Sequence, residues 1–385
     1  MKKRNHIDPT LLFCVLTLMV LSLGVVYSAS SAFAMERWGS SEKLMLLHAA
    51  KVLLSFVAII FFMNIDYRRF FRWSKPALLG AVSLLVLTLF FGGEVKGAAR
   101  WFLGVQPSEF ARFALVFHLC VLFSVKKERV KDFRTGFVPM MIWIGVVTLL
   151  VLLQPNFSSG AMICAISMVM LVVGGAKLTH VGLAVAATVP ALIAYMLSAP
   201  YRMNRVLAFI GAGSPAARKS HYQLDQGIIG FGNGGIFGVG LGQSKQRDFF
   251  LPESYGDFVF SIIGEEYGLI GTMLFLLLFL TIMLRGMRIA KHAKDDLGRY
   301  LATGITVVIT LYALINASVT LGLLPTTGLP MPFVSYGGSS MIFSAIAIGV
   351  LLNISSHTDL HPRFHLDVFK RKREPRPEPA VGQVF

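Results

Sequence analysis

The chain has 385 residues, of which 55% are hydrophobic and 15% are charged, and its mean hydropathy is +0.67. A soluble domain carries about 25% charged residues, so this composition excludes a soluble globular protein. The formal net charge is +16, but the cations are spread over many short segments and form no single basic face. We therefore predict no nucleic-acid partner.

Long apolar runs follow one another along the chain, and about 20 apolar residues suffice to cross a bilayer as a helix. We predict an all-α, polytopic integral membrane protein. The first run follows three cations, but it is too long for the apolar part of a typical signal peptide, so we interpret it as an uncleaved first span. About ten transmembrane helices are expected, at residues 10–34, 43–63, 76–92, 108–125, 136–153, 158–175, 179–198, 257–284, 301–323 and 333–355.

Most Lys and Arg residues fall in the two termini and in the loops that follow even-numbered runs. Short cytoplasmic loops are enriched in these cations, so both termini are predicted to be cytoplasmic. Residues 1–356 form one predicted transmembrane domain, with a long extracytoplasmic loop at about 199–256 between spans 7 and 8. Residues 357–385 are basic and rich in proline, and we expect a disordered cytoplasmic tail.

Three segments on the predicted outer side combine Gly or Pro with polar residues: 92–112, 200–256 and 323–340. Irregular backbone near a membrane persists only where protein buries it or where it lines a wet cavity. The three segments are therefore predicted to share an outward-facing cavity.

Asp257 begins the apolar run that follows the long outer loop. A carboxylate at this boundary suits a general base or a ligand for a charged substrate group; the alternative is a helix-start carboxylate favoured by the helix dipole. Arg202, Arg205, Lys245 and Arg247 precede it in the loop. Such cations suit an anionic group such as a pyrophosphate, although a solvated loop explains them equally well.

A second group of polar residues comprises Arg100, Trp101, Gln106, Glu109 and Arg112. Glu109 and Arg112 are three residues apart, so on a helix they share a face and can pair. One interpretation is that the pair anchors the span. The other is that Arg100 and Trp101 offer a cation and an aromatic plate to a sugar phosphate.

Glu265 and Glu266 lie about 12–14 Å further along the helix that Asp257 begins. Carboxylates at such depth are expected to be protonated or paired, and Lys51 and Arg112 are candidate partners. Ser335 and Tyr336 open the last predicted span; close helix packing is the default explanation, and a hydroxyl facing the cavity is the alternative.

Over residues 8–356 the chain resembles the SEDS family (shape, elongation, division and sporulation). The matching motifs are 98–101 with 106–109, 234–238, 251–253 with Asp257, 264–268 and 325–340. Two positions depart from the family pattern: Arg112 stands where the family usually has Lys, and residues 154–156 (QPN) lack the carboxylates that relatives often carry there. If relatives bind a metal through these carboxylates, this chain must bind any metal through other groups.

The resemblance implies a peptidoglycan glycosyltransferase that polymerises lipid II with inversion at the outer face of the bacterial cytoplasmic membrane. Asp257 matches the essential aspartate and is the expected general base. A divalent cation, Mg²⁺ or Mn²⁺, is a candidate cofactor with no assigned site. The expected substrate-binding residues are Arg100, Trp101, Gln106, Glu109, Arg112, Arg202, Arg205, Lys245, Glu253, Ser335 and Tyr336.

The resemblance also implies partners: a class B penicillin-binding protein transpeptidase and other membrane proteins of the divisome. Residues 27–30 and 323–328 are more similar to the family's cell-division member than to its elongation member, so location at the division septum is expected. The alternatives are an elongation-type polymerase, a lipid II flippase and a non-catalytic division scaffold. No clear internal repeat of the kind common in transporters is visible.

Overall fold

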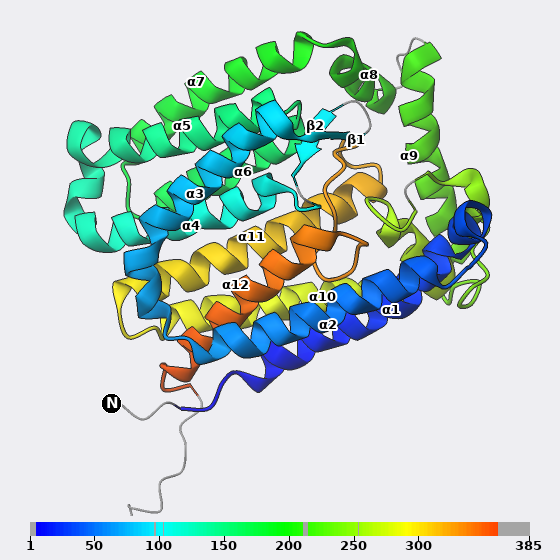
Figure 1. Ribbon diagram of the computed structural model, residues 1–385, viewed down its shortest axis with the longest axis horizontal. Helices are drawn as coiled ribbons and strands as arrows, with labels where there is room; N and C mark the ends of the chain where they lie inside the picture. The colour runs from blue at the N-terminus through cyan, green and yellow to red at the C-terminus, as the bar shows by residue number, and fades with distance from the viewer. Residues whose placement is uncertain (1–4, 96–97, 103, 211–214, 253, 361–385) are drawn as a thin grey trace, which may run out of the picture.

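The computed structural model describes residues 5–95, 98–102, 104–210, 215–252 and 254–360. Glu253 and most of the predicted tail, from residue 361 on, therefore lie outside the described residues. Figure 1 shows long helices that run side by side, with shorter elements gathered at one end. The helices are α1 (Pro9–Trp38), α2 (Lys43–Asn64), α3 (Phe70–Phe91), α4 (Pro107–Lys126), α5 (Val138–Leu153), α6 (Phe157–Val173), α7 (Leu178–Leu197), α8 (Pro200–Phe209), α9 (Pro215–Gly234), α10 (Val259–Lys291), α11 (Asp296–Thr320) and α12 (Gly338–Ser356).

Nine of the described helices are long and apolar enough to cross a membrane, and α6 is a shorter apolar helix. Together they correspond to the ten predicted spans. Helix bounds differ from the predicted ones by up to seven residues, and two late starts concern predicted site residues: α10 begins at Val259 and α12 begins at Gly338. Asp257, Ser335 and Tyr336 consequently lie in loops that precede helices, and not in helices as predicted.

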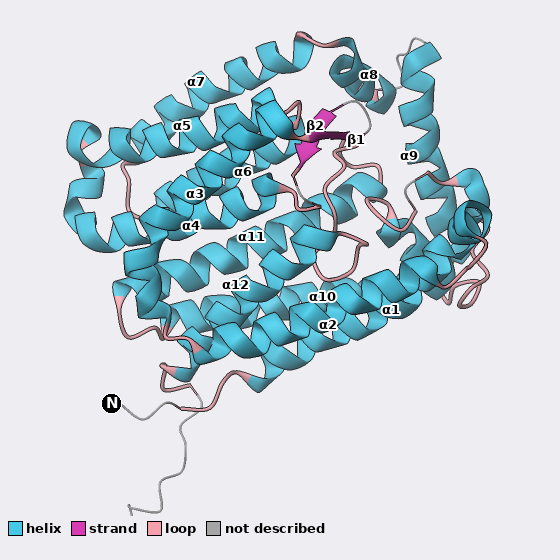
Figure 2. Ribbon diagram, in the orientation of Figure 1, coloured by secondary structure: helices cyan, strands magenta, loops and turns pink. Residues whose placement is uncertain are grey.

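The long outer loop is largely helical, because α8 and α9 lie within it. Within the described residues, one short strand pair departs from the all-α prediction: β1 (Gly93–Val95) pairs antiparallel with β2 (Ala98–Trp101). Figure 2 shows this hairpin at the same end of the bundle as α8 and α9. Irregular and non-helical segments are thus concentrated at one end.

Local signals explain the first helix. Asp8 caps α1, since its side chain accepts a hydrogen bond from the Leu11 amide at 2.9 Å, and Pro9 occupies the first helical position. Both residues are favoured there, because the cap satisfies an amide that has no partner within the helix and proline needs none. Gly39 ends the helix in the left-handed conformation with φ +68°.

The centre of the bundle is formed by α4, α11 and α12, whose apolar windows are 78%, 72% and 78% buried, against 11% for α7. Small residues bring these helices close. A Cβ atom on Gly304 of α11 would lie 2.7 Å from Val116 of α4, and one on Gly286 of α10 would lie 2.1 Å from Thr306 of α11. Close packing at glycine substitutes for the hydrophobic effect, which is weak between helices in lipid.

Both ends of the described chain meet at the end of the bundle opposite the hairpin. The Asn5 amide donates to the Ser356 carbonyl at 2.8 Å, and the Asp8 amide donates to the Ser355 hydroxyl at 3.0 Å. Arg285 of α10 forms an ion pair with Asp8. We call this the inner end, because the charge distribution predicts it to be cytoplasmic, and the opposite one the outer end.

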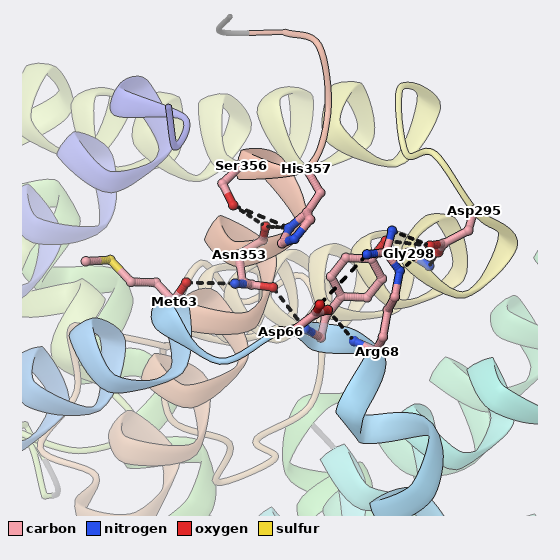
Figure 3. Close-up of polar contacts among 9 residues, drawn as sticks. Met63, Asp66, Arg68, Asp295, Gly298, Asn353, Ser356 and His357 are labelled. Carbon is pink, nitrogen blue, oxygen red and sulfur yellow. Dashed lines mark hydrogen bonds and ion pairs between the residues drawn. The ribbon is translucent and has the colours of Figure 1, made fainter. Parts of the chain in front are cut away.

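A polar network joins one helix junction to two helix ends at the inner end (Figure 3). The Tyr67 hydroxyl donates to Asp295 at 2.6 Å, and Arg68 binds the same carboxylate at 3.1 Å. The side chain of Asn353 donates to the Met63 carbonyl and accepts from the Tyr67 amide. These bonds tie the α2–α3 junction to the start of α11 and the end of α12.

Candidate active site

A cavity of about 930 Å³ lies at the outer end of the bundle. Its described lining comes mainly from residues 100–109, 155–159, 196–206, 252–257 and 325–340. These ranges include parts of all three outer segments, so the prediction of a shared cavity is confirmed. Its volume lies near the upper end of the range of ligand pockets, about 300–1,000 Å³.

Asp257 lies in the cavity wall, two residues before α10. Asn316 of α11 donates hydrogen bonds to the backbone carbonyls of Asp257 and Leu329, both at 2.8 Å. One amide side chain therefore holds the loop of Asp257 against residues 325–330. The carboxylate faces that segment, because a Cβ atom on Gly328, which has φ +76°, would lie 3.2 Å from Oδ2 of Asp257.

Three of the predicted arginines reach the cavity. Arg100 comes from β2 and donates to the Pro155 carbonyl, which fixes the hairpin against the α5–α6 turn. Arg202 and Arg205 come from α8. The guanidinium of Arg202 lies 3.7 Å from the ring centroid of Tyr195, while Arg205 donates to backbone carbonyls of residues 326 and 327 at 3.3 and 3.4 Å.

Lys51 of α2 is a further cation in the lining. Sequence reasoning considered it only as a partner for the buried glutamates. A charged residue within an apolar span was the available signal, because such residues usually face a protein interior or a wet cavity.

Glu109 and Arg112 form the predicted pair, with Nη2 of Arg112 2.7 Å from Oε2 of Glu109. Both residues are almost fully buried, at 3% and 2% exposure. Glu109 contributes to the cavity lining and Arg112 does not. The Arg112 guanidinium instead lies 3.9 Å from the ring centroid of Tyr312, so in this structure it reaches the cavity only through Glu109.

The remaining predicted residues divide between the lining and its support. Trp101, Gln106 and Tyr336 line the cavity. Ser335 does not: its hydroxyl accepts from the Met331 amide at 2.8 Å and closes a turn. Lys245 also lies outside the described lining, and its backbone amide binds Glu265 at 3.3 Å.

The side chains of Glu265 and Glu266 bind the outer loop and α1, and the proposed pairing with Lys51 or Arg112 is wrong. Glu266 accepts from the Ser28 hydroxyl of α1. Glu265 accepts hydrogen bonds from the Ser244 hydroxyl, the Asn233 side chain and the amides of Lys245 and Gln246. The donors of these bonds are uncharged: two hydroxyls, one amide side chain and two backbone amides. The sequence could not reveal them, because a search for cationic partners does not find uncharged donors.

No three His, Cys, Asp or Glu side chains come together as a metal site within the described ranges. In that part of the chain Asp257 and Glu109 are the carboxylates in the cavity lining, and Glu109 already binds Arg112. Mg²⁺ is commonly held by one or two carboxylates together with substrate phosphates. These two carboxylates leave most ligands of such an ion to the phosphates of a bound ligand.

Fold and site together define a multi-pass helical membrane protein with a charged, water-accessible cavity at one end. A sequence model described as "Cell cycle protein", covering FtsW, RodA and SpoVE, matches residues 9–360. The chain therefore belongs to the FtsW/RodA/SpoVE family, as the sequence motifs indicated.

Curated relatives match over nearly their whole length. A probable peptidoglycan glycosyltransferase FtsW from Geobacter metallireducens is 37% identical over 92% of this chain and 96% of the relative. Stage V sporulation protein E from Bacillus subtilis is 38% identical over 91% of this chain and 98% of the relative.

Solved structures show the same fold. One is described as "Structural coordination of polymerization and crosslinking by a peptidoglycan synthase complex"; its matching chain has a TM-score of 0.73 and 25% identity, with 92% of this chain and 99% of that chain covered. The rod shape determining protein RodA from Thermus thermophilus has a TM-score of 0.67 and 24% identity, with 91% and 96% covered.

Proposed function

We propose that this chain is a peptidoglycan glycosyltransferase that polymerises lipid II at the outer face of the cytoplasmic membrane during cell division. One observation carries the proposal: Asp257 shares a cavity with three arginines and a lysine at the end of the bundle opposite the termini. Family membership supports it, as do the names of the relatives.

The reaction needs a base and a stabiliser of negative charge. The Asp257 carboxylate takes the proton of the acceptor sugar hydroxyl while that oxygen bonds to the anomeric carbon of the donor. The bond to the lipid diphosphate breaks on the opposite side, so a single displacement inverts the anomeric configuration. Arg100, Arg202 and Arg205 lie in the same cavity and stabilise the charge that develops on the leaving diphosphate.

A divalent cation is part of the proposal. The diphosphate oxygens of the substrate would hold it on the side of the leaving group, and a bound ion would supply further stabilisation of negative charge there. Chelation with EDTA is expected to lower polymerisation by the purified protein, and added Mg²⁺ or Mn²⁺ is expected to restore it. Full activity after chelation would remove the ion from the mechanism.

The deciding experiment is polymerisation of lipid II by the purified protein, with Asp257→Asn in parallel. Removal of a general base typically costs about 10²–10⁴-fold in rate, and the isosteric amide keeps the shape of the site. Asp225→Asn is the matched control, because Asp225 lies on α9 of the same outer loop, binds His221 and is absent from the cavity lining.

The possible outcomes separate the candidate functions. Glycan strands from the wild type and from Asp225→Asn, but not from Asp257→Asn, would support both the polymerase activity and the role of Asp257 as general base. Normal production of glycan strands by Asp257→Asn would refute the assignment of Asp257 as the general base. No strands from any form, together with movement of lipid II across liposome bilayers, would favour the flippase.

We further propose that a class B penicillin-binding protein is the partner, within a septal complex of other divisome membrane proteins. The support is the structural match to a chain whose description couples polymerization with crosslinking in one synthase complex. A fluorescent fusion at mid-cell during division, with the transpeptidase co-purifying, is the expected result. An even distribution along the cell wall would favour the elongation-type alternative.

A further inference from the structure

Lys51 lies beside the start of the last helix. Its ammonium nitrogen is 3.6 Å from the ring centroid of Tyr336, and a Cβ atom on Gly338 would lie 3.7 Å from that nitrogen. Lys51 and Gly338 both line the cavity. Throughout the part of the chain that the structure describes, no carboxylate forms an ion pair with Lys51.

The cation–π contact fixes the position of the ammonium. Tyr336 is itself held in place, since its amide donates to the Tyr255 carbonyl at 2.9 Å and its ring meets the Tyr255 ring edge-on at 5.8 Å. A lysine held over an aromatic face loses little further entropy when it binds a ligand.

The start of α12 adds amide donors at the same place. Gly337 is the N-cap and Gly338 begins the 19-residue helix. The first amides of a helix have no partner within it, and they carry the positive end of the helix dipole. A lysine ammonium next to this end is an unfavourable arrangement unless an anion joins the two.

Ser340 is an independent sign of a ligand. Its side chain is 5% exposed and belongs to the cavity lining. Its hydroxyl has no hydrogen-bond partner among the residues described. A buried hydroxyl without a partner costs free energy, so an acceptor or donor supplied by a ligand would relieve that cost.

We propose that Lys51, Ser340 and the first amides of α12 form a diphosphate subsite within the cavity. The subsite rests on the proposed function, for which it names the binding place of the lipid-linked diphosphate. Lysine serves as a point charge for phosphate, and the hydroxyl and amides donate hydrogen bonds to phosphate oxygens. The arginines of β2 and α8 lie in the same cavity and stabilise the charge that develops on this diphosphate in the transition state.

The test measures ligand binding to the full chain in nanodiscs. The probes are undecaprenyl diphosphate, inorganic pyrophosphate and undecaprenol, which carries no phosphate. Lys51→Met is expected to raise the Kd for undecaprenyl diphosphate by about tenfold or more, the loss expected for a charge-assisted hydrogen bond. Lys51→Arg should restore most of the affinity, and Ser340→Ala should weaken binding by a smaller factor.

Lys43→Met is the matched control. Lys43 lies on the same helix, and its ammonium is 5.2 Å from the Trp38 ring centroid, but it is outside the described cavity lining. The control should leave the Kd unchanged. An equal loss of affinity in both Lys variants would show a general charge effect and would overturn the proposal. The proposal would also be overturned if Lys51→Met weakened the binding of undecaprenol as strongly as that of undecaprenyl diphosphate.

The measurement with pyrophosphate distinguishes the two sources of the anion. If both pyrophosphate and the lipid bind in a Lys51-dependent way, the subsite recognises the diphosphate alone. If only the lipid does so, the subsite recognises the diphosphate together with its lipid. An unchanged Kd in a folded Lys51→Met protein that still polymerises lipid II would refute the subsite and leave the function intact. Lys51-dependent binding by a wild type that never polymerises would refute the function and leave the subsite.

Discussion

At the scale of single residues, the buried pair of Glu109 and Arg112 borders the cavity through Glu109. Arg112 is paired at 2.7 Å and stacked on Tyr312. A lysine here, as the resemblance suggests for other family members, would keep the charge and lose both the planar stacking and the fork of donors. The arginine thus fixes the direction in which the Glu109 carboxylate faces.

Arg112→Met is expected to destabilise the protein by about 3–5 kcal/mol, because it leaves the Glu109 carboxylate buried without its counter-charge. Thermal or denaturant unfolding in detergent would measure the loss, and Glu109→Gln added to Arg112→Met should recover part of it. Arg299→Met is the matched control: Arg299 pairs with Asp296 at the same spacing and lies near the Tyr300 ring, but its side chain is 51% exposed. The control should change stability by no more than about 1 kcal/mol, and equal losses would contradict the argument.

At the scale of elements, the outer loop supplies hydrogen bonds to backbone groups of α10 where that helix is interrupted. Gly268 has φ +65° and ψ −162°, which interrupts the helix. The amides of Val239 and Gly240 donate to the carbonyls of Glu265 and Glu266, at 2.9 and 3.1 Å. Backbone groups freed by a break in a span need such partners, because lipid supplies none.

Gly238→Ala is expected to disrupt this junction. Gly238 has φ +83°, and an added Cβ atom would lie 2.1 Å from the Glu266 carbonyl oxygen, so the loop must move away from the helix. Gly235→Ala is the control for backbone conformation alone. It also has a positive φ, +53°, but nothing lies within 4 Å of its added Cβ. The control should cost about 1–2 kcal/mol, and unfolding measurements should show a clearly larger loss for Gly238→Ala.

At the scale of the whole molecule, the polar network of the inner end joins elements that are distant in sequence (Figure 3). Partial burial alone would raise the pKa of Asp295. Hydrogen bonds from the Tyr67 hydroxyl, the Gly298 amide and the Arg68 guanidinium outweigh it, so the pKa of that carboxyl lies below its usual range. The ionised carboxylate therefore stabilises the folded bundle.

This lowered pKa predicts a pH dependence of stability. The contribution of Asp295 is fully present above its unfolded pKa of about 3.9, and it is lost as pH falls through the lower folded value. Asp295→Asn should be less stable than the wild type at pH 7, and the difference between them should shrink below about pH 4. Unfolding at several pH values would test this, with Tyr67→Phe expected to reduce the dependence. A difference that stays constant down to pH 3 would contradict it.

The sequence by itself determined the ten spans, the shared outer cavity, the place of Asp257 at that cavity and the Glu109–Arg112 pair. Each follows from a local pattern: apolar length, breaker residues beside polar ones, a carboxylate at the start of an apolar run, or a spacing of three on a helix. The all-α class followed in the same way, except for the hairpin of β1 and β2.

Only the tertiary structure decided which cations enter the cavity. Lys51 lies within an apolar span and Lys245 lies in the outer loop. The packing of α2 against α12 brings Lys51 to the cavity, while the loop that binds Glu265 holds Lys245 apart from it. The same holds for Ser335 and Tyr336, which are neighbours in the sequence: Tyr336 lines the cavity, and Ser335 closes a turn outside the lining. The direction of a side chain in an irregular segment depends on backbone contacts from distant residues, and no spacing in the sequence encodes those contacts.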